Sequence, residues 1–178
     1  MRKVLYILGQ MTDQDVEWLG KSGARRSVPK GTAVIQQGKT TGRMLILLDG
    51  MMSVEVEGLG QVAQLHCGDV VGEMSFVDSR PPAATVVATS DCTVLDLSHE
   101  DVARKLDQDV GFSARFHRAL ARFLSDRMRA TLMHFSPKNK GPGGFDDEEE
   151  GELGIDLLDD VHMAGARFDR MLKKLMAV

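Results

Sequence analysis

The residues best suited to chemistry lie in one segment, 72–86, which reads Gly-Glu-Met-Ser-Phe-Val-Asp-Ser-Arg-Pro-Pro-Ala-Ala-Thr-Val. Gly72 permits a close approach of the backbone, and Met74–Val77 predict a short helical turn after it. The first amides of a helix lack internal acceptors and carry partial positive charge, which suits one phosphate group. Glu73 does not suit an anion, but its carboxylate can accept a hydrogen bond from a sugar hydroxyl. The segment therefore predicts a site for a sugar phosphate.

Short strands separated by glycine-rich turns surround this segment, between Ala24 and Leu97. The continuous apolar run 44–48 predicts a strand that is buried on both faces, and Asp49-Gly50 after it is a hairpin turn signal. Such strands predict a mainly β domain, a small sandwich or barrel with flanking helices. The expected strands span 33–35, 44–48, 52–57, 62–65, 84–88 and 93–97.

Helices are expected on both sides of the β region. Thr12 can cap a helix that ends at Gly23, and Ser98-His-Glu-Asp101 has the pattern of a capping box. A longer helix is predicted from about residue 109 to residue 133. Its apolar side carries Phe112, Phe116, Leu120, Phe123 and Leu124. Its basic side carries Arg115, Arg118, Arg122 and Arg129.

The chain after residue 135 changes character. Residues 136–154 form an acidic linker rich in glycine and proline, and we expect its acidic run 146–150 to lie across the basic side of the long helix. Residues 155–178 predict an amphipathic helix with a heptad-like seam. This helix could dock on its own domain, or it could bind a partner or a second copy, which we favour. The residues expected to bind the partner are Leu157, Val161, Phe168, Met171 and Leu175.

Composition narrows the function. The net charge of −4 is carried entirely by residues 136–178, so the domain at 1–135 is neutral, and we expect no binding to nucleic acid. No apolar run reaches membrane length, so we expect no membrane contact. Cys67 and Cys92 have neither disulfide nor zinc spacing, which favours a reducing cytoplasm. We expect no metal site and no enzymatic activity, because neither the histidines nor the cysteines form a recognisable cluster.

Segment 72–86 resembles the phosphate-binding cassette of the cyclic-nucleotide-binding domain family, which includes the bacterial cAMP receptor protein and the regulatory subunits of protein kinase A. Gly72-Glu-Met-Ser75 is similar to the first half of the family pattern, and Ala83-Ala-Thr-Val86 to the second. Pro29-Lys-Gly31, Gly38 and the stretch 45–50 resemble the family's β-roll framework.

The resemblance implies a fold and a site. The fold would be a jelly-roll-like β-roll of eight strands, followed by a C-helix at 109–133, with no DNA-binding domain. Glu73 would hold the ribose 2′-hydroxyl of cAMP or cGMP, and backbone amides would face the cyclic phosphate. The implied ligand-binding residues are Gly72, Glu73, Met74, Ser75, Arg80, Ala83, Ala84 and Thr85.

One position departs from the family pattern. Pro82 stands where the family has its phosphate-binding arginine, and Arg80 lies two residues earlier. Losing a charge-assisted bond to phosphate costs about 1.5–3 kcal/mol. Two functions therefore remain. The first is a regulatory sensor that binds a cyclic nucleotide and signals to a protein partner through its C-helix and tail, and the second is a ligand-free adaptor that uses the roll as a scaffold.

Overall fold

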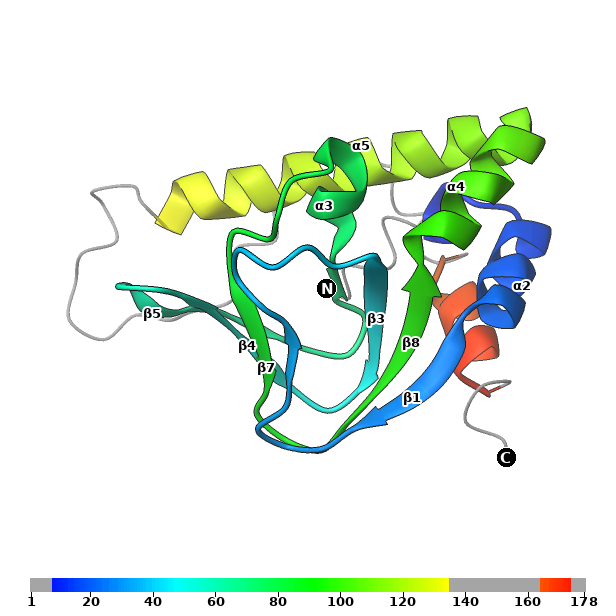
Figure 1. The fold of residues 1–178 in the computed structure, drawn as a ribbon. Coiled ribbons are helices and arrows are strands. Elements are labelled where there is room, and N and C mark those ends of the chain that lie inside the picture. The colour runs from blue at the N-terminus through cyan, green and yellow to red at the C-terminus, as the bar shows by residue number, and fades with distance from the viewer. Residues whose placement is uncertain (1–7, 135–163, 174–178) are drawn as a thin grey trace.

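The computed structural model describes residues 8–134 and 164–173, and these form a β-roll with helices packed along one side (Figure 1). Two four-stranded antiparallel sheets build the roll. The first sheet has the order β1 (Ala24–Val28), β8 (Cys92–Ser98), β3 (Arg43–Asp49) and β6 (Val70–Val71). The second has the order β2 (Ala33–Ile35), β7 (Thr85–Ala88), β4 (Met52–Val56) and β5 (Gly60–Leu65). The expected mainly β fold with flanking helices is confirmed.

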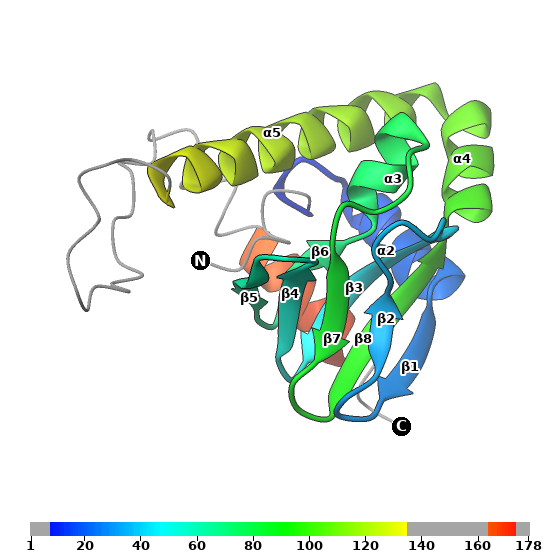
Figure 2. The ribbon, with the colours of Figure 1, turned by 60° about the vertical axis from the view of Figure 1, so that its left-hand side comes forward.

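The helices gather beside the first sheet and over one end of the roll. They are α2 (Asp13–Ser22), α3 (Glu73–Asp78), α4 (His99–Gln108), α5 (Val110–His134) and an unlabelled segment at 164–173. Figures 1 and 2 show α5 crossing that end, with α3 between α5 and the strands. The long helix therefore packs against α3, with Phe76 of α3 next to Phe116 of α5.

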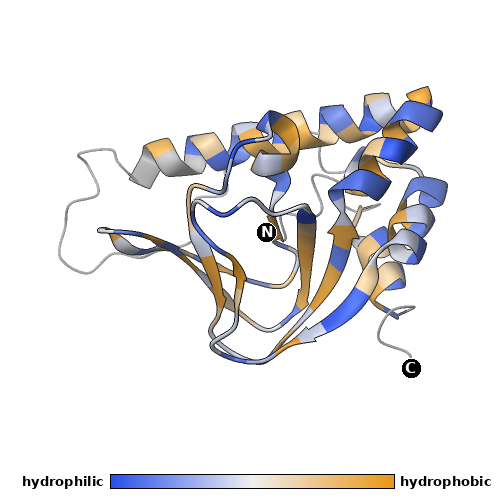
Figure 3. Cartoon of the chain, in the orientation of Figure 1, coloured by the Kyte–Doolittle hydropathy of each residue, from blue (hydrophilic) through white to orange (hydrophobic). Residues whose placement is uncertain are grey.

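Two separate cores lie on the two faces of the first sheet. The inner core fills the roll and draws on all eight strands, whereas the outer core joins the sheet to α2, α4, α5 and segment 164–173. β3 serves both, because Leu45 and Leu47 face inward while Met44 and Ile46 face the helices. Figure 3 shows this apolar character along β3. The prediction that 44–48 is buried on both faces is confirmed.

Local signals predicted α2 and α5 well. Thr12 caps α2 through a complete capping box with Asp15, and the predicted apolar side of α5 is buried at Phe112, Phe116 and Phe123. The capping box expected at Ser98 was wrong, since Ser98 makes no side-chain cap. Instead, the backbone N–H of His99 donates to the carbonyl oxygen of Gly42 across 2.8 Å and fixes the start of α4.

The hairpin expected at Asp49-Gly50 was also wrong. β3 and β4 belong to different sheets, so this turn carries the chain across the roll and pairs no strands. Gly50 is required for a different reason. A Cβ there would come within 2.5 Å of the carbonyl oxygen of Asp91 and 2.7 Å of Cys92 Sγ, at a φ of 92°.

Candidate functional site

The predicted cassette is the short helix and loop that join β6 to β7. Gly72 begins it with φ 86°, in the left-handed region that favours glycine. A Cβ atom at Gly72 would collide with the carbonyl oxygen of Arg43 on β3. The base of the cassette is therefore fixed closely against β3, and only glycine fits there.

The predicted helical turn is confirmed as α3. Gly72 supplies no side-chain cap to this helix, which is consistent with amides left for another acceptor. Phe76 anchors α3, because its ring lies 5.8 Å from that of Phe116 on α5 and 5.2 Å from that of His99. Met74 and Val77 point outward and are about half exposed. Ser75 is buried beneath them.

Glu73 is the most deeply buried carboxylate of the cassette, with 1% of its surface exposed. Arg127 of α5 donates from Nη1 to its Oε1 across 2.5 Å. A buried carboxylate is costly unless it is paired, so this bond ties the middle of α5 to the first residue of α3. The residue predicted to hold a sugar hydroxyl is thus already engaged by a cation from the long helix.

The loop from 79 to 84 is fastened at its far end to the turn between β2 and β3. Gly38 donates its N–H to the carbonyl oxygen of Pro82 across 2.9 Å, and Gln37 donates to Thr85 Oγ1 across 3.1 Å. The hydroxyl of Thr85, a predicted ligand contact, therefore holds this turn. Arg80 is exposed on the loop, where its own N–H donates to Asp78 Oδ1.

The remaining cassette residues, Ala83 and Ala84, lie at the junction of the loop and β7. Ala83 is exposed, and Ala84 packs partly against the inner core. Sequence reasoning missed Arg127, although one signal for it existed. Arg127 follows the buried Phe123 by four residues, so it lies one turn along the face of α5 that packs on the domain.

His99 lies directly behind the cassette. Its Nε2 atom is buried and has no hydrogen-bond partner within the described parts of the chain. Burial lowers the pKa of His99 from its ordinary value of 6.5, and the backbone carbonyls of Gly72 and Arg43 offset only part of that effect. The charge on Arg43 lowers the pKa further. The neutral imidazole is therefore the form that the fold favours.

The C-terminal segment 164–173 docks on its own domain. Ala164, Phe168 and Met171 are buried in the outer core, among residues of α2 and α5. Phe168 and Met171 were expected to bind a partner, and here the same chain covers them. The other three predicted contacts, Leu157, Val161 and Leu175, lie outside the described residues, as does the acidic linker.

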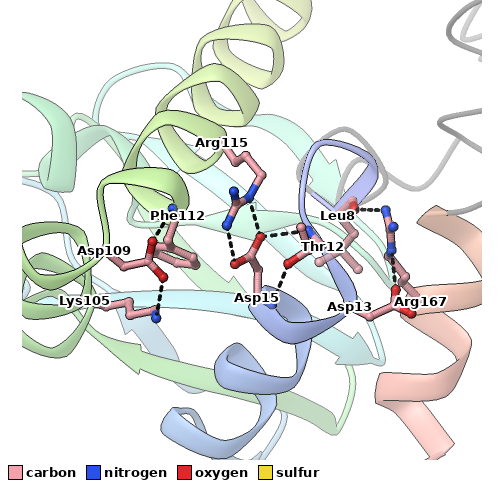
Figure 4. Close-up of polar contacts among 9 residues, drawn as sticks. All are labelled: Leu8, Thr12, Asp13, Asp15, Lys105, Asp109, Phe112, Arg115 and Arg167. Carbon is pink, nitrogen blue, oxygen red and sulfur yellow. Dashed lines mark hydrogen bonds and ion pairs between the residues drawn. The ribbon is translucent and has the colours of Figure 1, made fainter.

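Acidic residues at the start of α2 form ion pairs with both the C-terminal segment and α5 (Figure 4). Arg167 donates to Asp13 Oδ1 across 2.8 Å and to the carbonyl oxygen of Leu8 across 3.1 Å. Hydrogen bonds from Arg167 and then Arg170 lower the pKa of Asp13. Arg115 of α5 donates to both oxygens of Asp15. Arg115, which was expected to face the acidic linker, therefore has Asp15 as its counter-ion.

Neither a metal site nor a membrane span is found in the part of the chain that the structure describes. No group of three potential ligands among His, Cys, Asp and Glu gathers within residues 8–134 and 164–173. Over the same ranges, no helix is both long and apolar enough to cross a bilayer. Neither Cys67 nor Cys92 forms a disulfide, and Cys67 Sγ donates to the carbonyl oxygen of Leu48.

Two known proteins are similar to this chain in sequence. The "Pycsar effector protein XpPycTIR" of Xanthomonas perforans is 32% identical over 106 residues, which are 59% of this chain and 35% of that protein. The "Rap guanine nucleotide exchange factor 3" of Homo sapiens is 33% identical over 75 residues, which are 42% of this chain and 8% of that protein. The chain therefore aligns with about a third or less of the length of these relatives.

A solved structure supports the same fold. The crystal structure of a cyclic nucleotide-binding domain from Methylobacillus flagellatus superposes with a TM-score of 0.68 at 21% identity, over 78% of this chain and 84% of that one. Residues 25–109 match the family described as "Cyclic nucleotide-binding domain". This range contains all eight strands except the first residue of β1, and it also contains the cassette and α4. The β-roll of this chain is therefore a domain of the cyclic nucleotide-binding family.

Proposed function

We propose that the chain is a non-catalytic sensor that binds a cyclic nucleotide, or a related sugar phosphate, in the cassette at 72–85. Its family is one of regulatory modules. The observation that supports the proposal is the bond between Glu73 and Arg127, because it joins the expected ligand contact to the long helix. A ligand hydroxyl that bonds to Glu73 must share the carboxylate with Arg127 or displace it.

A route from the cassette to the C-terminal segment follows from the ion pairs. Arg127 and Arg115 lie on the same helix, and Arg115 is bonded to Asp15 at the start of α2. The neighbouring Asp13 is bonded to Arg167 of segment 164–173. A shift of α5 at Arg127 would thus change the surface on which the C-terminal segment docks.

The output of the sensor is the release of that segment. Phe168 and Met171 would become available to a protein partner only when they leave the outer core. Their packing is not seamless, since a hollow of about 320 Å³ lies between α2 and the segment, against Gly20 and Met171. The ligand acts only through its different affinity for the docked and released arrangements.

A ligand-free adaptor is the second candidate, and one observation favours it. Arg127 satisfies Glu73 without any ligand, while Pro82 leaves the cassette loop without a buried cation of its own. In that case the Glu73–Arg127 bond is structural, and the roll is a scaffold for protein contacts. We infer a cytoplasmic setting for either candidate, because neither Cys67 nor Cys92 forms a disulfide.

Calorimetric titration of the full chain with cAMP and with cGMP tests the choice. Heat of binding at micromolar ligand is expected for the sensor, whereas no heat at millimolar ligand would favour the adaptor. Hydrolysis of either nucleotide during the titration would contradict the non-catalytic assignment.

The coupling to α5 needs a second measurement. Amide exchange along segment 164–173 is expected to speed up on ligand binding in the natural chain and to lose that response in Arg127→Gln. Arg129→Gln is the matched control, since Arg129 is an exposed arginine on the same helix. Equal responses in both variants would contradict the proposed route.

A further inference from the structure

A second charged cluster lies at the end of the roll beside the cassette. Asp96 of β8 has 3% of its surface exposed and lies between two arginines. Arg43 Nε lies 2.7 Å from its Oδ1, and Arg26 Nε lies 3.4 Å from its Oδ2. One carboxylate cannot neutralise two guanidinium groups, so the cluster keeps one net positive charge.

The cluster belongs to the inner face of the first sheet. Side chains alternate along a strand, and Leu45 and Leu47, which share the face of Arg43, lie in the inner core. By the same alternation, Asp96 shares the face of Val94, which is also in the inner core. Arg43 is about half exposed, so the cluster lies at the open rim of the roll rather than in its interior.

Arg43 also lies next to the cassette. β3 and β6 pair antiparallel with Leu45 opposite Val71, and the chain then leaves the sheet at Gly72. The carbonyl oxygen of Arg43 is the atom that excludes a Cβ at Gly72. The guanidinium is therefore carried by the strand that forms the base of the cassette.

The cassette loop supplies no equivalent charge. Arg80 is exposed, and the two prolines after it have no N–H to donate. The carbonyl of Pro82 is bonded to Gly38, which holds the loop in place. At the start of α3, Arg127 is already paired with Glu73, so a further cation for an anion there must come from another element. β3, whose backbone lies against Gly72, carries Arg43.

We propose that Arg43 is the cation that binds the phosphate of the ligand in this chain. The assignment rests on the proposed sensor function. Asp96 is a positioning residue, because it bonds Nε and leaves the Nη groups of Arg43 as donors. Arg26 also pairs with Asp96, so the negative charge of Asp96 is shared and neutralises Arg43 only in part. The site therefore selects a sugar that carries a phosphate over the nucleoside alone.

The test measures the affinity of the full chain for cAMP and cGMP and for the matching nucleosides. Arg43→Gln is expected to weaken cyclic nucleotide binding about ten- to a hundredfold, with little effect on the nucleoside. Arg43→Lys should retain part of the affinity, since it keeps the charge but loses the planar fork. Arg104→Gln is the matched control, because Arg104 is an exposed arginine on α4 that pairs with Glu100, and we expect this variant to bind cyclic nucleotides as the natural chain does.

Two further variants protect the test against misfolding. Arg43→Gln combined with Asp96→Asn removes the buried carboxylate along with its partner, and the same loss of affinity is expected in this double variant. Asp96→Asn alone should weaken binding less than Arg43→Gln does. Adding Asp96→Asn to Arg43→Gln should not restore any of the lost affinity. Cyclic nucleotide binding that survives Arg43→Gln but is lost in Arg80→Gln would overturn the assignment. A natural chain that binds no cyclic nucleotide would overturn the sensor function itself.

Discussion

Arg115 donates to both carboxylate oxygens of Asp15, from Nε across 2.7 Å and from Nη2 across 2.9 Å, and it joins residues 100 positions apart. Asp15 also accepts from the backbone N–H of Thr12 and completes the capping box of α2. Burial raises the pKa of Asp15, but the bonds from Arg115 and Thr12 outweigh it, and the net pKa is lowered. One carboxylate thus fixes both the start of α2 and its contact with α5.

Asp15→Asn should lower the free energy of unfolding by about 2 kcal/mol, because it removes a charge-assisted bidentate pair and weakens the cap. Urea unfolding measures the change. Asp107→Asn is the control, since Asp107 is exposed on α4, and its effect should stay within about 0.5 kcal/mol. Equal effects of the two substitutions would contradict the importance of the Arg115–Asp15 pair.

The Glu73–Arg127 pair should show energetic coupling. Glu73→Gln, Arg127→Gln and the double variant complete a double-mutant cycle, and we expect an interaction of about 1–3 kcal/mol, since each single variant leaves a charged group without its partner. A control cycle built from Glu73→Gln and Arg129→Gln should give additive effects on the free energy of unfolding. Additivity for Arg127 as well would mean that the pair carries no net interaction.

Stability should rise with pH around the ordinary pKa of His99. The lowered pKa means that the unfolded chain binds a proton more readily than the folded chain. The contribution of His99 is therefore complete above pH 6.5 and falls as the pH drops from 6.5 towards the folded pKa. His99→Gln should flatten this part of a plot of unfolding free energy against pH, whereas His117→Gln, at an exposed site, should leave it unchanged.

Phe168→Ala should detach the C-terminal segment from α2. Truncation of a fully buried phenylalanine costs about 3–5 kcal/mol. Amide exchange at Val16 and Leu19 should accelerate, because both lie in the outer core with Phe168. Lys173→Ala, at an exposed position of the same segment, is the control and should leave the exchange of α2 unchanged.

Much of the fold could be predicted because its signals are local. The cap at Thr12, the apolar run of β3 and the Gly72 turn each fit within a few residues, and the structure has each of them. Asp49-Gly50 shows the limit of such signals. The residue types in a turn predict that the chain changes direction, but they do not predict which strands then pair.

The candidate site was only partly predictable, since its charges are paired across the fold. Glu73 meets Arg127 over 54 positions, and Arg43 meets Asp96 over 53. Alternation and helical spacing can place such a side chain on a face, but they do not identify the partner. The tail shows the same limit: its seam predicted a contact surface, and the structure buries Phe168 and Met171 of that seam in the outer core, among residues of α2 and α5.

The first sheet separates two apolar interiors that share strands but no space. A change of contacts in the helical layer would consequently leave the packing of the inner core in place. A domain divided in this way can exchange the partners of its outer layer repeatedly without the cost of unfolding, as a reversible switch requires.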